Sequence, residues 1–99
     1  MKDRRIEIDK DLKPIIPQFL ENRKKDIKEI ESYLKEDNFK QIKIIGHSMK
    51  GSGGGYGFEE ITKIGEKIEK AAKDENEEEI TRQVEYLNIY LEEVEVVYK

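Results

Sequence analysis

Apolar residues recur every three or four positions along most of this chain, and that spacing restricts it to helices that pack along narrow apolar faces. Side chains three and four residues apart lie on the same face of an α-helix. The most regular case is the segment from Glu77 to Tyr98, whose stripe consists of Ile80, Val84, Leu87, Leu91, Val94 and Tyr98. Alternating steps of four and three residues are typical of a bundle seam. This segment is therefore predicted to be one long helix.

Three further segments carry a stripe of the same kind, and short polar stretches separate them. They run from Leu12 to Asp37, from about Phe39 to Gly53, and from about Phe58 to Lys73. Their predicted inward positions are Ile16, Leu20, Arg23, Ile27, Ile30 and Leu34, then Phe39, Ile42, Ile45/Gly46 and Met49, then Ile61, Ile64/Gly65, Ile68 and Ala71/Ala72. Four amphipathic helices with short connections predict an all-α fold, an antiparallel up-down-up-down four-helix bundle.

The N-terminal end has a weaker pattern. Residues 1–11 are highly charged, and we expect a short arm that packs loosely or frays, with Asp9 or Asp11 capping the first helix. Residues 12–99 then form the bundle as a single domain. Two prolines stand where the first helix begins, so a short first turn followed by a kink at Pro17 is expected.

The composition is that of one small domain with a thin core. A chain of 99 residues is long enough for a single core. Charged residues make up 42% of it and hydrophobic residues 35%, a balance that would suit disorder if the apolar residues were scattered rather than striped. The sequence has no cysteine, which excludes disulfides and cysteine-based metal sites.

Charge and hydropathy argue against two classes of partner. The formal net charge of −4 argues against non-specific nucleic-acid binding through the whole surface. No apolar run approaches the roughly 20 residues that a membrane-spanning helix needs. A cytoplasmic monomer without a membrane or nucleic-acid partner is therefore expected.

One stretch interrupts this regular pattern. Residues 46–58 contain six of the seven glycines and the only histidine of the chain, His47. A glycine inside a helix costs roughly 1 kcal/mol relative to alanine. Tolerating such a cluster suggests that something approaches the backbone closely at this point.

His47 is predicted to face solvent. At about 100° per residue, it lies about 140° from Ile42, the centre of the buried stripe. A neutral imidazole is a good nucleophile towards phosphorus near physiological pH. Five residues are expected beside it on the same exposed face. Lys50 and Lys43 could stabilise a phosphoryl group. Gly51 and Gly54 present bare main chain, and the apolar side chain of Ile44 could help a partner dock.

Each of these features has an ordinary explanation when it is taken alone. A single histidine on a polar helix face is usually a surface residue without a function, exposed lysines usually serve solubility, and glycine-rich stretches are usually loops. Their coincidence on one predicted helix face favours a functional interpretation.

The residues from His47 to Phe58 also resemble the signature of histidine-containing phosphotransfer (HPt) domains. The sequence His-Ser-Met-Lys-Gly-Ser-Gly-Gly-Gly-Tyr-Gly-Phe fits the order of histidine, any residue, an aliphatic residue, Lys-Gly, two small residues and a hydrophobic-Gly pair. Residues 16–23, 45–46 and 64–72 fit the neighbouring helices of such domains. The three successive glycines at 53–55 depart from the pattern and could end the second helix early.

The resemblance implies a role for several residues. His47 would be phosphorylated through Nε2, and Lys50 would assist the binding of the phosphate and of the receiver. Gly51 would admit the partner, while Tyr56 and Gly57 would form the bend into the next helix, with Tyr56 packing inward.

The resemblance also implies partners and a type of reaction. The phosphoryl group would arrive from an aspartyl phosphate on a response-regulator receiver domain and leave to another receiver, with a histidine kinase upstream. The receiver would supply Mg²⁺, so the domain would be a phosphocarrier without a cofactor or metal site of its own and without kinase activity.

Several rival functions can be weighed on the sequence. No P-loop pattern can be written through residues 46–57, which argues against an ATP-dependent kinase. The acidic residues fall mostly on predicted outer faces, which argues against a carboxylate metal site. Two alternatives stay open: an interaction module that binds a receiver or kinase without being phosphorylated, and the phosphate-accepting domain of a chemotaxis-type kinase. The length from Met1 onward favours a free-standing protein, although a piece of a longer one would look identical.

Overall fold

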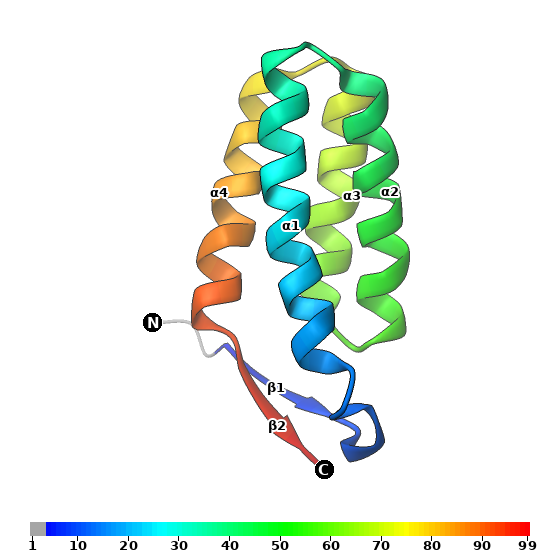
Figure 1. The fold of residues 1–99 in the computed structure, drawn as a ribbon, viewed down its shortest axis with the longest axis vertical. Coiled ribbons are helices and arrows are strands. Elements are labelled where there is room, and N and C mark those ends of the chain that lie inside the picture. Colours follow the sequence, from blue (N-terminus) through cyan, green and yellow to red (C-terminus); the bar gives the residue numbers. More distant parts are fainter. Residues whose placement is uncertain (1–3) are drawn as a thin grey trace.

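Four helices running alternately up and down make up most of the molecule (Figure 1). The computed structural model describes residues 4–99. The helices are α1 (Ile16–Lys35), α2 (Phe39–Gly55), α3 (Glu59–Lys73) and α4 (Glu77–Glu93). The prediction of an all-α four-helix bundle is confirmed.

The two connections at the same end of the bundle are built alike. Asp37 and Glu75 each take a positive φ of 53°, which ends the preceding helix. The next residue in each case, Asn38 or Asn76, accepts a hydrogen bond from a main-chain amide in the first turn of the following helix. These polar stretches therefore act as the helix breaks that the sequence indicates.

The first helix begins later than predicted. Residues Lys10–Leu12 form a separate 3₁₀ turn, which Asp9 caps by accepting a hydrogen bond from the Asp11 amide. Because α1 starts only at Ile16, Pro17 lies in its first turn, where a missing N–H costs nothing. The expected first turn is present, but Pro17 does not kink a helix that began at Leu12.

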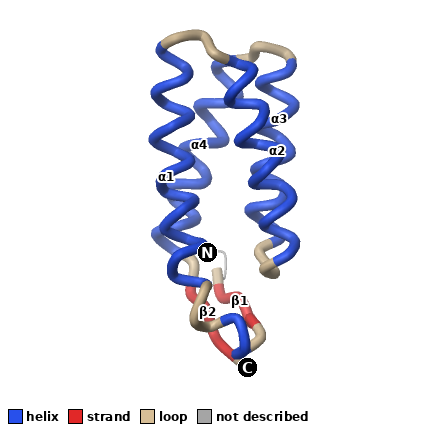
Figure 2. The backbone as a smooth tube through the Cα atoms, turned by 45° about the vertical axis from the view of Figure 1, so that its right-hand side comes forward, coloured by secondary structure: helices blue, strands red, loops and turns tan. Residues whose placement is uncertain are grey.

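The two ends of the chain correct the sequence prediction. Strand β1 (Arg5–Ile8) pairs in parallel with β2 (Glu95–Tyr98). Figure 2 shows these two strands below the helices. The predictions of a fraying arm and of a last helix through Tyr98 were therefore wrong for these residues, since α4 ends at Glu93. The segment Glu95–Tyr98 is rich in β-branched and aromatic residues, which favour a strand. The predicted arm also includes residues 1–3, which lie outside the described residues.

The core follows the predicted stripes with one shift in α4. Ile30, Ile42, Met49, Ile68 and Leu87 are fully buried, as expected. Near the end of α4, however, Tyr90 is buried while Leu91 is only partly covered. Burial raises the pKa of the Tyr90 phenol to about 12.

Arg23, which stands in the apolar stripe of α1, has polar partners that explain its position. Its Nε donates to Asp26 over 2.8 Å and its Nη1 to the Ser52 hydroxyl over 3.1 Å, while the guanidinium lies over the Phe19 ring. Burial raises the pKa of Asp26, although the charge of Arg23 opposes that shift. The arginine therefore connects α1 to α2.

Helices α2 and α3 pack more closely than any other pair, and glycines make that possible. A Cβ atom on Gly46 would lie 2.7 Å from the Glu69 amide nitrogen, and one on Gly65 would lie 2.5 Å from the Lys50 amide nitrogen. A Cβ atom on Gly53 would lie 2.7 Å from the Thr62 amide nitrogen. We call Gly46, Gly53 and Gly65 the glycine seam.

The second helix continues through the three glycines at 53–55, contrary to the expectation that it weakens or ends there. Gly53 is held against α3, and the Thr62 hydroxyl donates to the Lys50 carbonyl over 3.2 Å. After Gly55 the chain turns through Gly57, whose φ of +88° suits glycine. Tyr56 packs inward as expected, with its ring centroid 4.6 Å from that of Phe19.

Candidate functional site

His47 lies in the middle of α2 and projects into solvent. Its side chain is 73% exposed, while the preceding residue, Gly46, is buried against α3. The predicted outward orientation of the imidazole is confirmed, and the ring is accessible to another protein.

One ring nitrogen of His47 has a partner that the sequence reasoning did not identify. Nδ1 lies 3.0 Å from Oε2 of Glu69, on α3. The Glu69 side chain is only 24% exposed. A signal was present in the sequence, because Glu69 stands one helical turn after Gly65 and so shares the face on which α2 packs.

The lysines around His47 come from two helices. Lys43 is exposed, and it lines a groove of about 470 Å³ together with Glu66, Glu69, Lys70 and Lys73. Lys50 is partly buried, and its main chain lies against the glycine seam. The sequence predicted Lys43 and Lys50 in this region, and the structure adds two lysines from α3.

The charges are distributed unevenly over the helices. In sequence, α2 contains three lysines and no acidic residue, whereas α4 contains six glutamates and one arginine. The histidine therefore lies on a helix with a charge of +3 in a chain whose net charge is −4. An acidic partner would be attracted to this helix rather than to α4.

The predicted docking residues are open to solvent. Among the residues that the structure describes, a Cβ atom on Gly51 would have no atom within 4 Å, and one on Gly54 would make only an ordinary contact of 3.5 Å with the Thr62 hydroxyl. Ile44 is 53% exposed. Gly55, which the sequence reasoning did not include, is as open as Gly51.

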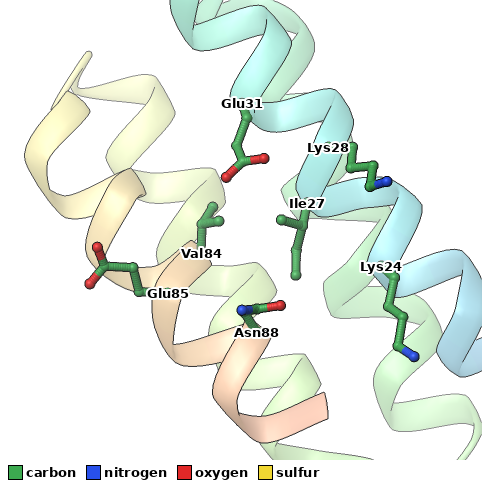
Figure 3. Close-up of a pocket in the computed structure, with 7 residues that line it drawn as sticks. All are labelled: Lys24, Ile27, Lys28, Glu31, Val84, Glu85 and Asn88. Carbon is green, nitrogen blue, oxygen red and sulfur yellow. The ribbon is translucent and has the colours of Figure 1, made fainter. Parts of the chain in front are cut away.

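A different hollow lies between α1 and α4, and it contains none of these residues. It has a volume of about 380 Å³ and is lined by Lys24, Ile27, Lys28, Glu31, Val84, Glu85 and Asn88. Figure 3 shows Ile27 and Val84 pointing toward one another from the two helices. Within residues 4–99, no group of three or more potential metal ligands is arranged to hold an ion. No helix in that part of the chain is long and apolar enough to cross a membrane.

Comparisons with known proteins identify one relationship. A family model described as "Hpt domain" matches residues 15–96, which include all four helices. Searches of curated proteins and of solved structures gave no significant match.

Proposed function

This chain belongs to the Hpt domain family, the histidine phosphotransfer domains of two-component systems, and on that premise we propose that it is a phosphorelay carrier with His47 as the phosphorylated residue. His47 receives a phosphoryl group from the aspartyl phosphate of a response-regulator receiver and passes it to a second receiver. A histidine kinase supplies the phosphate upstream.

The observation that carries this proposal is the exposure of His47. A phosphoryl donor held in the pocket of another protein can reach only a nucleophile that projects from the surface. His47 meets that condition with 73% of its side chain accessible, and Gly51, one turn further along α2, leaves open space beside it.

The transfer is a displacement at phosphorus. The lone pair of His47 Nε2 attacks the phosphorus atom, and the bond to the aspartyl oxygen breaks with its electrons remaining on the carboxylate. The neutral imidazole thereby becomes a positively charged ring that bears the phosphoryl group, so the total charge is conserved. Lys50 stabilises the phosphoryl oxygens.

The domain contributes a nucleophile and a surface, while the receiver contributes the rest. Mg²⁺ and the acidic pocket belong to the receiver, whose negative charge is complementary to the lysines of α2. We assign the docking surface to Lys43, Ile44, Gly51 and Gly54 around His47. Hpt domains are phosphocarriers rather than kinases, so we expect no phosphorylation from ATP alone.

The proposal is tested by incubating the protein with a panel of phosphorylated receivers and locating the transferred phosphate by mass spectrometry. We expect an acid-labile, alkali-stable phosphoramidate on His47. His47→Gln is expected to abolish labelling and to leave the melting temperature almost unchanged, because the side chain is exposed.

Two outcomes would contradict the proposal. An acid-stable label on Ser48 or Ser52 would assign the phosphate to a hydroxyl instead. Stable binding of a receiver without any transfer of phosphate would mean that the domain is an interaction module and not a phosphocarrier.

A further inference from the structure

We propose that Thr62 and Arg23 are positioning residues for the docking surface, because they hold the glycine-rich end of α2, residues 50–55, in helical form from two sides. Thr62 acts from α3 and Arg23 from α1. The inference rests on the proposed function for its consequence in phosphoryl transfer, whereas the hydrogen bonds belong to the free protein. Both residues act through α2 and not on the phosphoryl group itself.

The sequence of the glycine-rich end does not favour a helix by itself. Four of the last five residues of α2, 51–55, are glycine, and glycine has the lowest helix propensity of any residue except proline. A short helical segment is marginal in water and depends on tertiary packing. The segment is nevertheless helical through Gly55, so contacts with the neighbouring helices must hold it.

Thr62 provides the contact from α3. Its hydroxyl donates a hydrogen bond to the main-chain carbonyl of Lys50 over 3.2 Å. The same hydroxyl lies close to the next turn of α2, since a Cβ atom on Gly53 would be 2.7 Å from it and one on Gly54 would be 3.5 Å from it. The absence of side chains at these two positions therefore leaves room for the threonine to reach the carbonyl.

Arg23 provides the contact from α1. Its Nη1 donates to the Ser52 hydroxyl over 3.1 Å, and that hydroxyl donates in turn to the Met49 carbonyl over 3.3 Å. The Arg23 side chain is 11% exposed, and its Nε lies 2.8 Å from the Asp26 carboxylate. Hydrogen bonds from a charged donor are stronger than those between neutral groups. The arginine is therefore a fixed anchor for this side of α2.

The two anchored residues are the sequence neighbours of Gly51. Lys50 is bonded through its carbonyl and Ser52 through its hydroxyl. The amide of Lys50 is also packed against α3, because a Cβ atom on Gly65 would lie 2.5 Å from its nitrogen. Gly51 is thus held between two fixed points, and the point from which the Lys50 side chain extends is fixed as well.

A surface that is already ordered costs less to bind than one that must be ordered on binding. If the glycine-rich end were helical in only a fraction of the molecules, the apparent dissociation constant for a receiver would rise in inverse proportion to that fraction. Once a receiver is bound, the segment is ordered again. Losing either hydrogen bond should therefore raise the receiver concentration needed for half-maximal transfer and change the maximal rate little.

The test compares the wild-type protein with Thr62→Val and Thr62→Ser. Valine has the shape of threonine without its hydroxyl, whereas serine keeps the hydroxyl. Thr81→Val is the matched control, because Thr81 is an exposed threonine on α4. Arg23→Lys tests the α1 side, since lysine keeps the positive charge beside Asp26 but lacks the planar fork with which arginine bonds two partners.

Three measurements are made on each protein. Amide hydrogen exchange compares residues 50–55 with residues 39–49 of the same helix. Single-turnover reactions with one phosphorylated receiver give the half-saturating receiver concentration and the maximal rate. Titration calorimetry with the same receiver in its unphosphorylated form gives the dissociation constant without any transfer.

We expect Thr62→Val and Arg23→Lys to speed exchange at residues 50–55 by about two- to tenfold, the range that the loss of one hydrogen bond gives. Exchange at residues 39–49 should change less. The half-saturating receiver concentration and the dissociation constant should rise by a similar factor. Thr62→Ser and Thr81→Val should stay close to the wild type in all three measurements.

Four outcomes overturn the inference. Thr62→Val could leave exchange at residues 50–55 unchanged, or Thr62→Ser could be impaired as strongly as Thr62→Val. Exchange that speeds up equally along the whole of α2 would indicate a loss of overall stability instead. Faster exchange at residues 50–55 with unaltered receiver binding would mean that the bond supports the helix but does not position the docking surface.

The proposed function fails on a different result. A wild-type protein that binds receivers without being phosphorylated would refute the phosphorelay role, and the calorimetric comparison would still decide whether Thr62 positions the docking surface. Absence of binding to any receiver would refute both proposals.

Discussion

The two faces of α2 are both rich in glycine, but for opposite reasons. On the face against α3, Gly46 and Gly53 leave no room for even one methyl group. On the solvent face, Gly51 and Gly55 have no atom of the described part of the chain within 4 Å of where a side chain would begin. The first pair is required by the fold, whereas nothing in the fold requires the second pair.

This difference separates the structural and functional demands on one helix. An exposed glycine in a helix costs roughly 1 kcal/mol relative to alanine, and no contact within residues 4–99 compensates for that cost at Gly51. Approach by a partner would account for it. The packed face positions His47 against α3, and the open face leaves the imidazole accessible, so substitutions on the two faces should have separable effects.

The largest effect is expected from Gly65→Ala, on the packed side. The added methyl group would lie 2.5 Å from the Lys50 amide nitrogen, so α2 and α3 must move apart. Overpacking of this kind typically costs about 1–3 kcal/mol. The free energy of unfolding, measured in urea, should fall by about that amount despite the better helix propensity of alanine.

The same variant tests whether the seam controls the nucleophile. If the two helices separate, the contact between His47 and Glu69 should lengthen, and the rate of phosphoryl transfer should fall along with the free energy of unfolding. An unfolding free energy equal to that of the wild type would mean that the helices adjust freely, and the contrast between the two faces would lose its basis.

A smaller and different effect is expected from Gly51→Gln, on the open side. The new side chain has free space in the isolated protein, so the unfolding free energy should not fall. The side chain would occupy the region that a receiver must approach, and we expect the transfer rate to fall by on the order of tenfold, equivalent to about 1.4 kcal/mol. Rates measured with one receiver under single-turnover conditions provide the test, with Gly51→Ala as an intermediate variant. A normal rate in Gly51→Gln would show that the docking surface lies elsewhere.

Much of the fold could be predicted because helical spacing is a local property. The four stripes and the polar breaks identified the bundle and placed most helix ends within two residues. The strand pair could not be predicted in the same way, because Arg5–Ile8 pairs with a segment about 90 residues away in the sequence. The spacing of Val94 and Tyr98 is compatible with a helix and also with a strand. Only the pairing of β2 with β1 determines that this segment is a strand.

The sequence predicted those features of the site that depend on one helix alone. The angle around α2 correctly gave the exposure of His47, Ile44 and Gly51, since each depends on one helix and one core direction. The contact of Glu69 with His47 was missed because it depends on the register between two helices. Spacing placed Gly46 and Gly65 on the packed side and Gly51 on the open side correctly, but it assigned no side to Gly53 or Gly55.

The smallest effect is expected from Gly55→Ala. This variant also tests most directly the difference between the packed and the open glycines of α2. Gly55 is the last residue of α2, does not have a positive φ, and has open space at its Cβ position. Alanine should therefore fit without strain and should stabilise the protein by about 0.4–1 kcal/mol, chiefly by reducing the freedom of the unfolded chain. Gly53→Ala is the matched comparison two residues earlier, where the methyl group would meet the Thr62 amide nitrogen at 2.7 Å. Urea unfolding of the two variants should shift in opposite directions, because the same substitution meets solvent in one case and the main chain of α3 in the other.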